Sequence, residues 1–225
     1  MTELKKAFVQ LLCESQMIKF GSFQTKAGRT SPYFINSGMI CKSDHIRRCG
    51  EIYAQTLVHK FGNSTKHLYG PAYKGIPLVT MTAASLGQLG YKNYTSTFNR
   101  KEAKDHGEKG VLVGQPLNAG DKVIIIEDVL SRGTSFKDTI ELLKRMDVSV
   151  AGLLVGVDRQ EQGFGNEIAS VEISKVWNIP VVSIINMTEL TTVLRESDEI
   201  KASFGIDEKV ITGIDQYLQK WNSAR

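Results

Sequence analysis

Short apolar runs alternate along the chain with stretches whose apolar residues recur at helical spacing. The runs predict strands at 67–70, 91–98, 111–114, 122–126, 150–157 and 180–185. The helical spacing predicts helices at 3–16, 76–89, 134–146, 167–177, 188–195 and 208–221. Ser43-Asp44 predicts the N-cap of a further helix that ends near Lys60. This alternation predicts an α/β fold with a central, mostly parallel sheet flanked by helices.

Two segments depart from the strand–helix alternation. Residues 19–36 combine partial alternation of apolar and polar positions with turn signals, which predicts a short β-hairpin. The last helix carries an apolar stripe that is more typical of core or of a subunit contact than of a ligand site. Its members are Val210, Ile211, Ile214, Tyr217, Leu218 and Trp221. No repeat or linker divides the chain, so we expect a single domain over residues 1–225.

Composition narrows the class of protein. With 225 residues, of which 41% are hydrophobic, the chain is long enough to bury a full core. It has neither a run of about 18 apolar residues nor the apolar core of a signal peptide at its start, so we expect a soluble intracellular protein. The cysteines Cys13, Cys41 and Cys49 lack metal-type spacing, which favours the reducing cytoplasm. The net charge is +4, and the basic residues are spread along the chain, so the charge does not identify a binding partner.

The strongest chemical signal is the segment from Val123 to Ser135. A strand with no polar position, typical of a buried parallel strand, runs into Glu127 and Asp128 and then into a turn and a helix. Ligands of open α/β sheets bind at the carboxyl ends of strands, and N–H groups of such a turn can hold a phosphate. Two carboxylates repel a bare phosphate but suit sugar hydroxyls or a developing cation. The alternative is an ordinary strand–turn–helix unit capped by Ser131 or Thr134.

This segment resembles the 5-phosphoribosyl 1-pyrophosphate (PRPP) signature of the type I phosphoribosyltransferases. Four further segments resemble the orotate phosphoribosyltransferase family, in the family's order: 20–34, 70–77, 98–107 and 158–161. The resemblance implies the type I phosphoribosyltransferase fold, with residues 18–40 as a small N-terminal hood over the base site. It also implies transfer of the 5-phosphoribosyl group from PRPP to orotate, giving orotidine 5′-phosphate and pyrophosphate in de novo pyrimidine biosynthesis. Mg²⁺ held mainly through PRPP, and a homodimer with shared active sites that binds neither nucleic acid nor membrane, are implied as well.

The resemblance also assigns roles to individual residues. Those implied to bind PRPP are Lys26, Tyr73, Lys74, Arg100, Lys101, Lys104, His106, Glu127, Asp128, Val129, Leu130, Ser131, Arg132, Gly133, Thr134 and Ser135. Those implied to bind orotate are Phe34, Ile35, Ser131 and Arg159, and those implied to act in catalysis are Lys104, His106 and Asp128. Within the charged loop 100–110, read as a lid over the leaving pyrophosphate, Arg100, Lys104 and His106 would act across the dimer and Lys101 within its own chain.

Physical chemistry supports several of these roles, and each has a plainer alternative. Lys74 is a point charge suited to pyrophosphate, although a loop lysine is usually only exposed. Arg159 follows the strand 150–157, where its guanidinium can hold the planar carboxylate that orotate has and that uracil and purines lack. The alternative for Arg159 is a structural ion pair with Asp158 or Glu161. For Phe34, the alternative is core packing.

The sequence departs from the family pattern in three places, and two other functions stay open. Glu127 stands where the family has Asp, Arg132 stands where a small residue is usual, and Ile35 replaces a common aromatic residue. Arg132 either adds a phosphate or lid contact or points to solvent. The other functions are a phosphoribosyltransferase for another base and a non-enzymatic PRPP sensor that binds nucleic acid. Arg159 and the hood with Lys26 argue against the first, and a lid with Lys104 and His106 argues against the second.

Overall fold

The central element of the fold is a mostly parallel sheet. The computed structural model describes residues 2–25, 29–62, 64–101 and 111–221, and in this part of the chain the sheet has six strands in the order β5-β4-β3-β6-β7-β8. Their bounds are β3 (His67–Gly70), β4 (Thr95–Asn99), β5 (Leu112–Gly114), β6 (Lys122–Leu130), β7 (Ser149–Asp158) and β8 (Val181–Asn186). All neighbouring pairs are parallel except β4 and β5. The predicted sheet is therefore confirmed.

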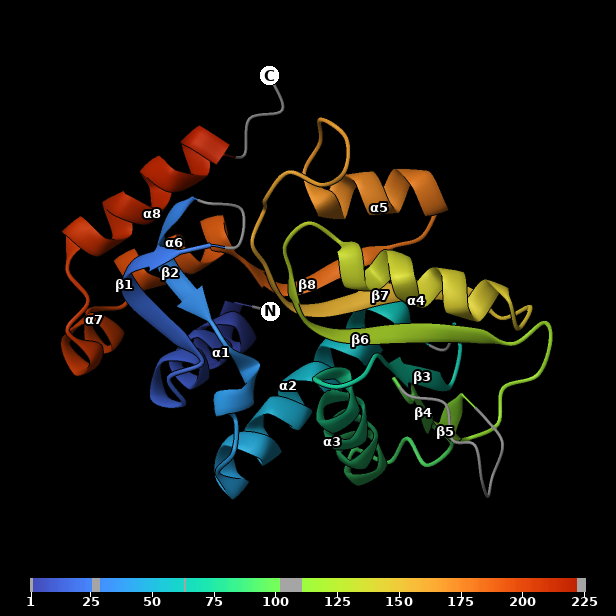
Figure 1. Cartoon of the computed structure of the whole chain (residues 1–225). Helices are drawn as coiled ribbons and strands as arrows, with labels where there is room; N and C mark the ends of the chain where they lie inside the picture. The colour runs from blue at the N-terminus through green and yellow to red at the C-terminus, as the bar shows by residue number, and fades with distance from the viewer. Residues whose placement is uncertain (1, 26–28, 63, 102–110, 222–225) are drawn as a thin grey trace.

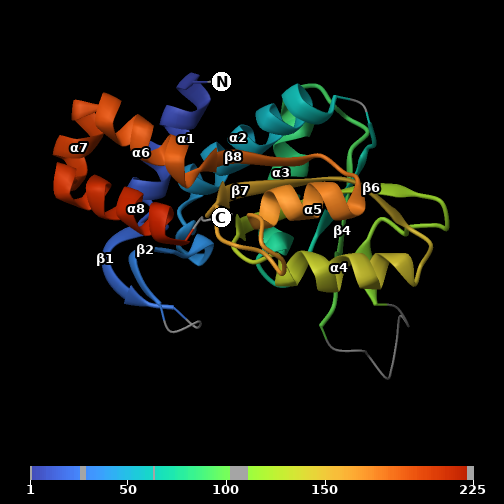
Figure 2. The ribbon, with the colours of Figure 1, turned by 90° about the horizontal axis from the view of Figure 1, so that it is seen from above.

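Helices cover both faces of this sheet (Figures 1 and 2). One face packs against α1 (Thr2–Glu14), α2 (Ser43–Phe61) and α3 (Gly75–Gln88), and the other against α4 (Thr134–Lys144) and α5 (Ala169–Trp177). Successive side chains of a strand point to opposite faces. In β6, Ile124 and Ile126 therefore enter the first core, whereas Val123 and Ile125 enter the second. Burial on both sides explains why residues 123–126 of this strand have no polar position.

The hood is an antiparallel hairpin, as predicted, made of β1 (Ile18–Gln24) and β2 (Thr30–Ile35). It packs on a helical layer formed by α1 and the closing helices α6 (Met187–Glu196), α7 (Asp198–Phe204) and α8 (Glu208–Trp221). The rings of Tyr33 in β2 and Tyr217 in α8 meet edge to face, with their centroids 5.8 Å apart. Four members of the predicted α8 stripe are buried, namely Ile211, Ile214, Tyr217 and Leu218. This stripe is core, as expected.

Most element boundaries differ from the sequence prediction by one to four residues, and one helix was not predicted. The N-cap of α2 is Lys42 rather than Ser43, and no side chain of the described residues caps that end. Strand β6 continues four residues beyond Ile126, because its ladder with β7 runs on to the pair Leu130–Asp158. Helix α7 was not predicted; it is short, and the Ser197 hydroxyl caps it by accepting a hydrogen bond from the N–H of Ile200. The two acidic residues of the chemical signal thus lie inside a strand rather than after it.

Two structural features relate to the cellular environment predicted from the sequence: the state of the cysteines and the apolar character of the helices. All three cysteines are free thiols, with Cys13 and Cys49 buried and Cys41 exposed. Burial raises the pKa of Cys13 and Cys49 to about 12, so both stay protonated and pack as small apolar side chains. Among the helices of the described ranges, none combines the length and the apolar character needed to cross a membrane.

Candidate active site

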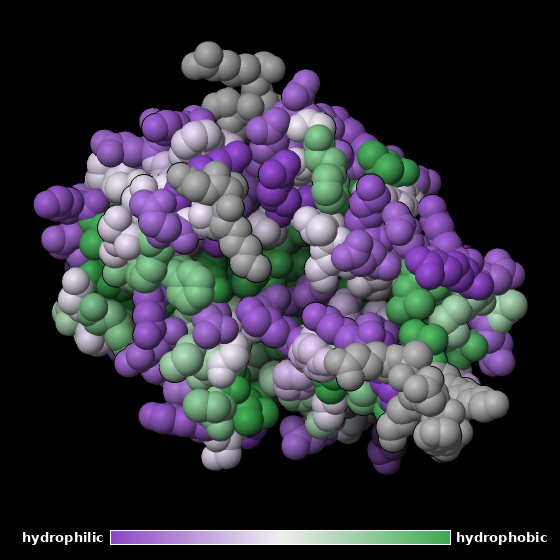
Figure 3. Space-filling model, viewed as in Figure 1, coloured by the Kyte–Doolittle hydropathy of each residue, from purple (hydrophilic) through white to green (hydrophobic). Residues whose placement is uncertain are grey.

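A cavity of about 770 Å³ opens at the carboxyl edge of the sheet, beside the ends of β3 and β6. Its lining comes from the β3–α3 turn, the segment after β4, the second half of β6, the turn before α4, the first residues of α4 and the middle of β7. These residues are Pro71, Ala72, Tyr73, Lys74, Lys101, Glu127, Asp128, Val129, Leu130, Ser131, Gly133, Thr134, Ser135, Phe136, Leu153 and Val155. In Figure 3 this face of the molecule is hollowed near the centre of the view, with hydrophilic side chains around the hollow. The volume suits one small-molecule ligand.

Two adjacent buried carboxylates line the cavity from within β6. The exposed fractions of Glu127 and Asp128 are 9% and 6%. As neighbours in one strand they point to opposite faces of the sheet. Glu127 turns toward α4, where the Ser135 hydroxyl donates to its Oε1 over 2.6 Å. Asp128 turns toward the hood, where the Ser37 hydroxyl donates to its Oδ2 over 2.5 Å.

The environment of Glu127 shifts its titration toward neutral pH. Burial raises its pKa to about 7, the adjacent Asp128 charge acts in the same direction, and the hydrogen bond from Ser135 opposes both. A carboxyl with this pKa is partly protonated near pH 7. It can therefore meet a sugar hydroxyl either as an acceptor or, when protonated, as a donor.

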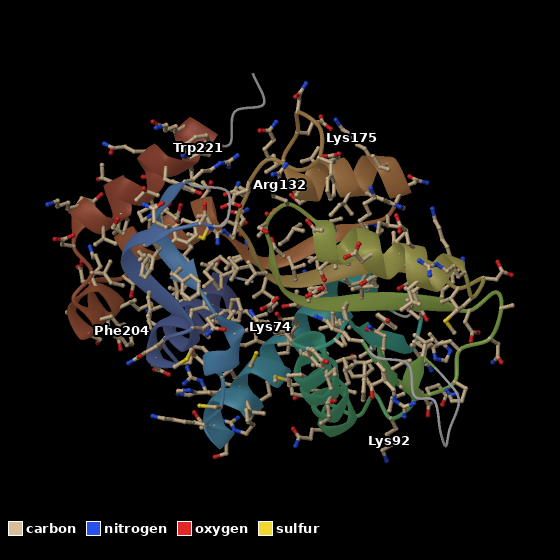
Figure 4. The ribbon with its side chains drawn as sticks, in the orientation of Figure 1. Lys74, Lys92, Arg132, Lys175, Phe204 and Trp221 are labelled. Carbon is tan, nitrogen blue, oxygen red and sulfur yellow. The ribbon has the colours of Figure 1, made fainter. Side chains whose placement is uncertain are left out.

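Asp128 is held by three donors. Besides Ser37, these are the Lys74 ammonium, 3.2 Å from Oδ2, and the backbone N–H of Val129, 2.8 Å from Oδ1. Lys74 is half-exposed, so it borders both the carboxylate and the open cavity. Figure 4 shows it between the hood and the sheet. Sequence reasoning missed Ser37, because it lies 91 positions from Asp128 in a short 3-10 turn and no local pattern links the two.

The turn before α4 leaves backbone donors open to the cavity. Gly133 is the N-cap residue, in the left-handed conformation with φ 81°, and no side chain within the described ranges caps the helix. The alternative of a cap by Ser131 or Thr134 is therefore wrong. The first N–H groups of a helix lack partners within the helix and attract anions, and the hydroxyl-bearing residues of this turn line the same cavity.

The glycines of the β3–α3 turn allow two backbone segments to approach each other closely. A Cβ atom on Gly70 would lie 2.2 Å from the carbonyl oxygen of Gly75, so only glycine fits there. The Ala72–Tyr73 peptide is cis, and the N–H of Ala72 donates to Asn99 Oδ1 over 2.9 Å. Asn99, at the end of β4, is a second residue that sequence reasoning missed. This turn fixes the backbone that carries Lys74.

Arg159 follows β7 at the same edge, as predicted, and takes part in an ion pair. Its Nη2 lies 2.7 Å from Oε1 of Glu161, so the structural pairing considered from the sequence is present. The Tyr217 hydroxyl donates to the same oxygen over 3.2 Å. Burial and the Glu161 charge raise the pKa of Tyr217, so its hydroxyl stays protonated and able to donate. The guanidinium carbon lies 4.9 Å from the centre of the Tyr33 ring.

Like Arg159, the remaining predicted residues that the structure describes are not among those lining the cavity. Phe34 is exposed, packs against Phe23 and borders a separate hollow of about 370 Å³, whereas the buried Ile35 belongs to the core; neither is among the cavity-lining residues. Arg132 is exposed beside that lining and donates to the carbonyl of Gly163 over 3.4 Å (Figure 4). Arg100 lies just beyond β4, and its N–H donates to the carbonyl of Val111 over 2.8 Å. Lys26, Lys104 and His106 lie outside the described residues.

Comparison with known proteins defines first the class of this fold and site. Residues 43–182 match the model of the phosphoribosyl transferase domain, and this span contains β3, β6, the turn before α4 and Arg159. The match places the acidic pair and the phosphate turn inside a domain family whose members transfer phosphoribosyl groups.

Full-length relatives then define the particular family. The orotate phosphoribosyltransferase of Clostridium beijerinckii is 39% identical over 224 residues, which cover 99% of this chain and 100% of that protein. That of Thiobacillus denitrificans is 41% identical over 194 residues, covering 86% and 90%. The crystal structure of the Francisella tularensis orotate phosphoribosyltransferase superposes with a TM-score of 0.79 at 33% identity, covering 96% and 99% of the two chains. The chain belongs to the orotate phosphoribosyltransferase family.

Proposed function

We propose that the cavity at the carboxyl edge of the sheet transfers the 5-phosphoribosyl group from PRPP to orotate. The products are orotidine 5′-phosphate and pyrophosphate, and the reaction belongs to de novo pyrimidine biosynthesis. The chain is an orotate phosphoribosyltransferase, a pentosyltransferase, as its full-length relatives are. The observation that carries this role in the structure is the meeting of Glu127, Asp128 and an uncapped helix start in one cavity.

The phosphate turn and the acidic pair suit the two ends of a phosphorylated sugar. N–H groups at the start of α4, with the hydroxyls of Ser131 and Thr134, supply donors for the 5′-phosphate. Glu127 and Asp128 supply acceptors for ribose hydroxyls. Their negative charge would stabilise the cation that develops at the anomeric carbon. Lys74, which lines the same cavity and is half-exposed, would neutralise pyrophosphate as it leaves. Lys104 and His106, from the resemblance, would add charge there when the lid closes.

On the base side, Arg159 is proposed to bind the orotate carboxylate. Its side chain is 14% exposed, so a carboxylate reaching it is partly removed from water, where a charge-assisted pair is strong. Phe34 and Ile35 remain proposed contributors through the hood, by backbone groups and apolar surface. Ser131, which lines the cavity, is proposed to contact both substrates.

Mg²⁺ is proposed as the cofactor, bound mainly through oxygens of PRPP. The described residues that line the cavity offer two carboxylates, Glu127 and Asp128, so most ligands of the ion would have to come from the substrate. Asp128 is moreover neutralised by Lys74. Mg²⁺ commonly keeps substrate and water oxygens as most of its ligands. When bound, it would neutralise charge on the pyrophosphate.

We also propose a cytoplasmic homodimer with shared active sites, whose partners are its two substrates and neither nucleic acid nor membrane. The proposal rests on the family resemblance of the loop 100–110. Mixing a Lys104→Ala chain with an Asp128→Asn chain should restore activity, because one site of each heterodimer then lacks both lesions. No recovery after verified subunit exchange would contradict shared sites.

Product formation tests the activity itself. The purified protein is incubated with PRPP and orotate, with and without Mg²⁺, and parallel reactions contain uracil or a purine base. We expect pyrophosphate release with orotate and Mg²⁺ and little with the other bases. A comparable rate with another base would identify a different phosphoribosyltransferase. PRPP binding without turnover on any base would identify a sensor.

A further inference from the structure

Glu161, two residues after Arg159, is a buried carboxylate with two partners. It is 8% exposed, and its Oε1 accepts one hydrogen bond from Arg159 and one from Tyr217. Tyr217 comes from α8, 56 positions further along the chain. A buried carboxylate requires such partners, because an unpaired charge in the interior is costly. Glu161 therefore ties the loop after β7 to the last helix of the chain.

The face of the Arg159 guanidinium also contacts an aromatic ring. Its central carbon lies 4.9 Å from the centre of the Tyr33 ring, and that ring packs edge to face on Tyr217 at an interplanar angle of 82°. Tyr33 is 1% exposed and Tyr217 is 6% exposed, so both rings are fixed by the surrounding core. An arginine side chain has much rotamer freedom to lose on binding a ligand. Here the ion pair and the ring restrict that freedom before any ligand arrives.

Two polar atoms in this cluster stay unsatisfied. Nε of Arg159 and the hydroxyl of Tyr33 are both buried and have no hydrogen-bond partner in the part of the chain that the structure describes. A buried donor without a partner costs free energy, which an incoming acceptor recovers. Glu161 therefore does not satisfy the guanidinium completely. It engages Nη2 and leaves a donor for a ligand.

We infer that Glu161 and Tyr217 are positioning residues, which hold Arg159 in the orientation that accepts the carboxylate of the base. This inference rests on the proposed role of Arg159 in orotate binding. Among the described residues, Arg159, Glu161 and Tyr217 all lie outside the lining of the cavity at the carboxyl edge. Selection of a carboxylate-bearing base thus depends on α8, through the hydrogen bond from Tyr217 to Glu161.

The test is orotate affinity and steady-state kinetics of Tyr217→Phe, which removes the hydroxyl and keeps the ring on Tyr33. We expect the orotate dissociation constant to rise about three- to tenfold, the range for losing one net hydrogen bond. The KM for PRPP and kcat should stay at wild-type values. In an Arg159→Ala background the same substitution should have no further effect on orotate, because Tyr217 acts through Arg159.

Two further variants keep the test decisive. Tyr94→Phe is the matched control, since it loses a tyrosine hydrogen bond, to the carbonyl of Gly62, at the opposite end of the sheet; it should leave orotate binding unchanged. Glu161→Gln keeps the shape of the side chain and should weaken orotate as well. Tighter orotate binding by Glu161→Gln would show that Glu161 competes with the substrate, and it would overturn the inference.

Other outcomes separate this inference from the proposed function. Unchanged orotate affinity in Tyr217→Phe, or an equal loss of PRPP affinity, overturns the positioning role while orotate binding by the wild type stands. The same holds if Tyr217→Phe still weakens orotate in the Arg159→Ala background. A wild-type protein that binds PRPP and not orotate would instead contradict the proposed function.

Discussion

The proposed ribose-phosphate side and the proposed base side of the site are built in different ways. The groups proposed to bind ribose and its phosphate come from one continuous stretch, residues 127–135, and Lys74 lines the same cavity. The base side combines Arg159 and Glu161 after β7 with Tyr33 from the hood and Tyr217 from α8. On the first side the proposed phosphate donors are backbone groups of a turn. On the second side the proposed binding group is one side chain, Arg159, which contacts side chains from distant parts of the chain.

This difference explains why a short motif identifies the class of enzyme and not its base. A phosphate can be bound by the backbone of a turn, so nine consecutive residues are enough to define that side. A planar carboxylate requires one guanidinium in a defined orientation, and its supports come from elements that meet only in the folded protein. The predictions below test this division.

The largest expected effect is that of Arg159→Ala on orotate. Loss of the only side chain proposed to hold the carboxylate should weaken orotate by roughly 2–4 kcal/mol, the scale for breaking a buried charge-assisted pair. PRPP should bind nearly as in the wild type, because its phosphate turn is separate. Arg159→Lys should restore little, since an ammonium lacks the planar two-pronged geometry. Calorimetry with each substrate measures both effects, and normal orotate binding by Arg159→Ala would make this residue purely structural.

The next effect concerns Glu127 and depends on pH. Its pKa is raised by burial from the ordinary 4.5 to about 7, so between these values the folded state holds a proton that the unfolded chain has released. The free energy of unfolding of the wild type should therefore fall as pH rises through this window, by up to about 3 kcal/mol.

The variant Glu127→Gln isolates this contribution, because it keeps an acceptor for Ser135 and cannot ionise. Its stability relative to the wild type should increase from pH 5 to pH 8 in urea unfolding experiments. A difference that stays constant across this range would show that Glu127 does not titrate in the window.

Gly133→Ala should destabilise the protein by about 1–2 kcal/mol, the cost of the left-handed conformation for a residue with a Cβ atom. The new Cβ would also lie 3.0 Å from Ile173 Cδ1. Gly87→Ala, within α3 and with open space around the position, is the matched control and should stabilise slightly. Thermal or urea unfolding measures both. Equal effects of the two substitutions would show that the turn tolerates another backbone conformation.

The smallest effect is expected for Arg132→Ala. This side chain is exposed, and its hydrogen bond to Gly163 is long, so the free energy of unfolding should change by less than about 0.5 kcal/mol. The KM for PRPP should also stay close to the wild-type value, because Arg132 is not among the cavity-lining residues. A severalfold rise in that KM would instead assign Arg132 a contact with phosphate.

The sequence predicted the parts of the fold that depend on local pattern. The prediction matched β3 and α8 at both ends, because turn residues or caps bound their apolar patterns. Strand β6 was predicted too short, since Glu127 and Asp128 resemble the end of a strand until the ladder with β7 is known. Helix α7, with 7 residues, is too short to show a clear period.

The candidate site likewise contains residues that the local sequence pattern predicts and residues that it does not. The phosphate turn and the acidic pair were predicted with their neighbours, because they are contiguous. Ser37 and Tyr217 were not assigned to the site, since their hydrogen bonds to Asp128 and Glu161 span 91 and 56 positions. Such contacts follow from how the hood and α8 pack on the sheet, and no spacing in the sequence encodes them.

The most direct test of the two-sided site is a crossed kinetic measurement on Arg159→Ala and Asp128→Asn, with KM determined for both substrates. Arg159→Ala should raise the KM for orotate and leave that for PRPP nearly unchanged. Asp128→Asn should do the reverse, raising the KM for PRPP about ten- to a hundredfold, the range for losing a hydrogen bond to a charged group. If each variant raises both KM values equally, the two sides are one coupled unit, and the division drawn here is contradicted.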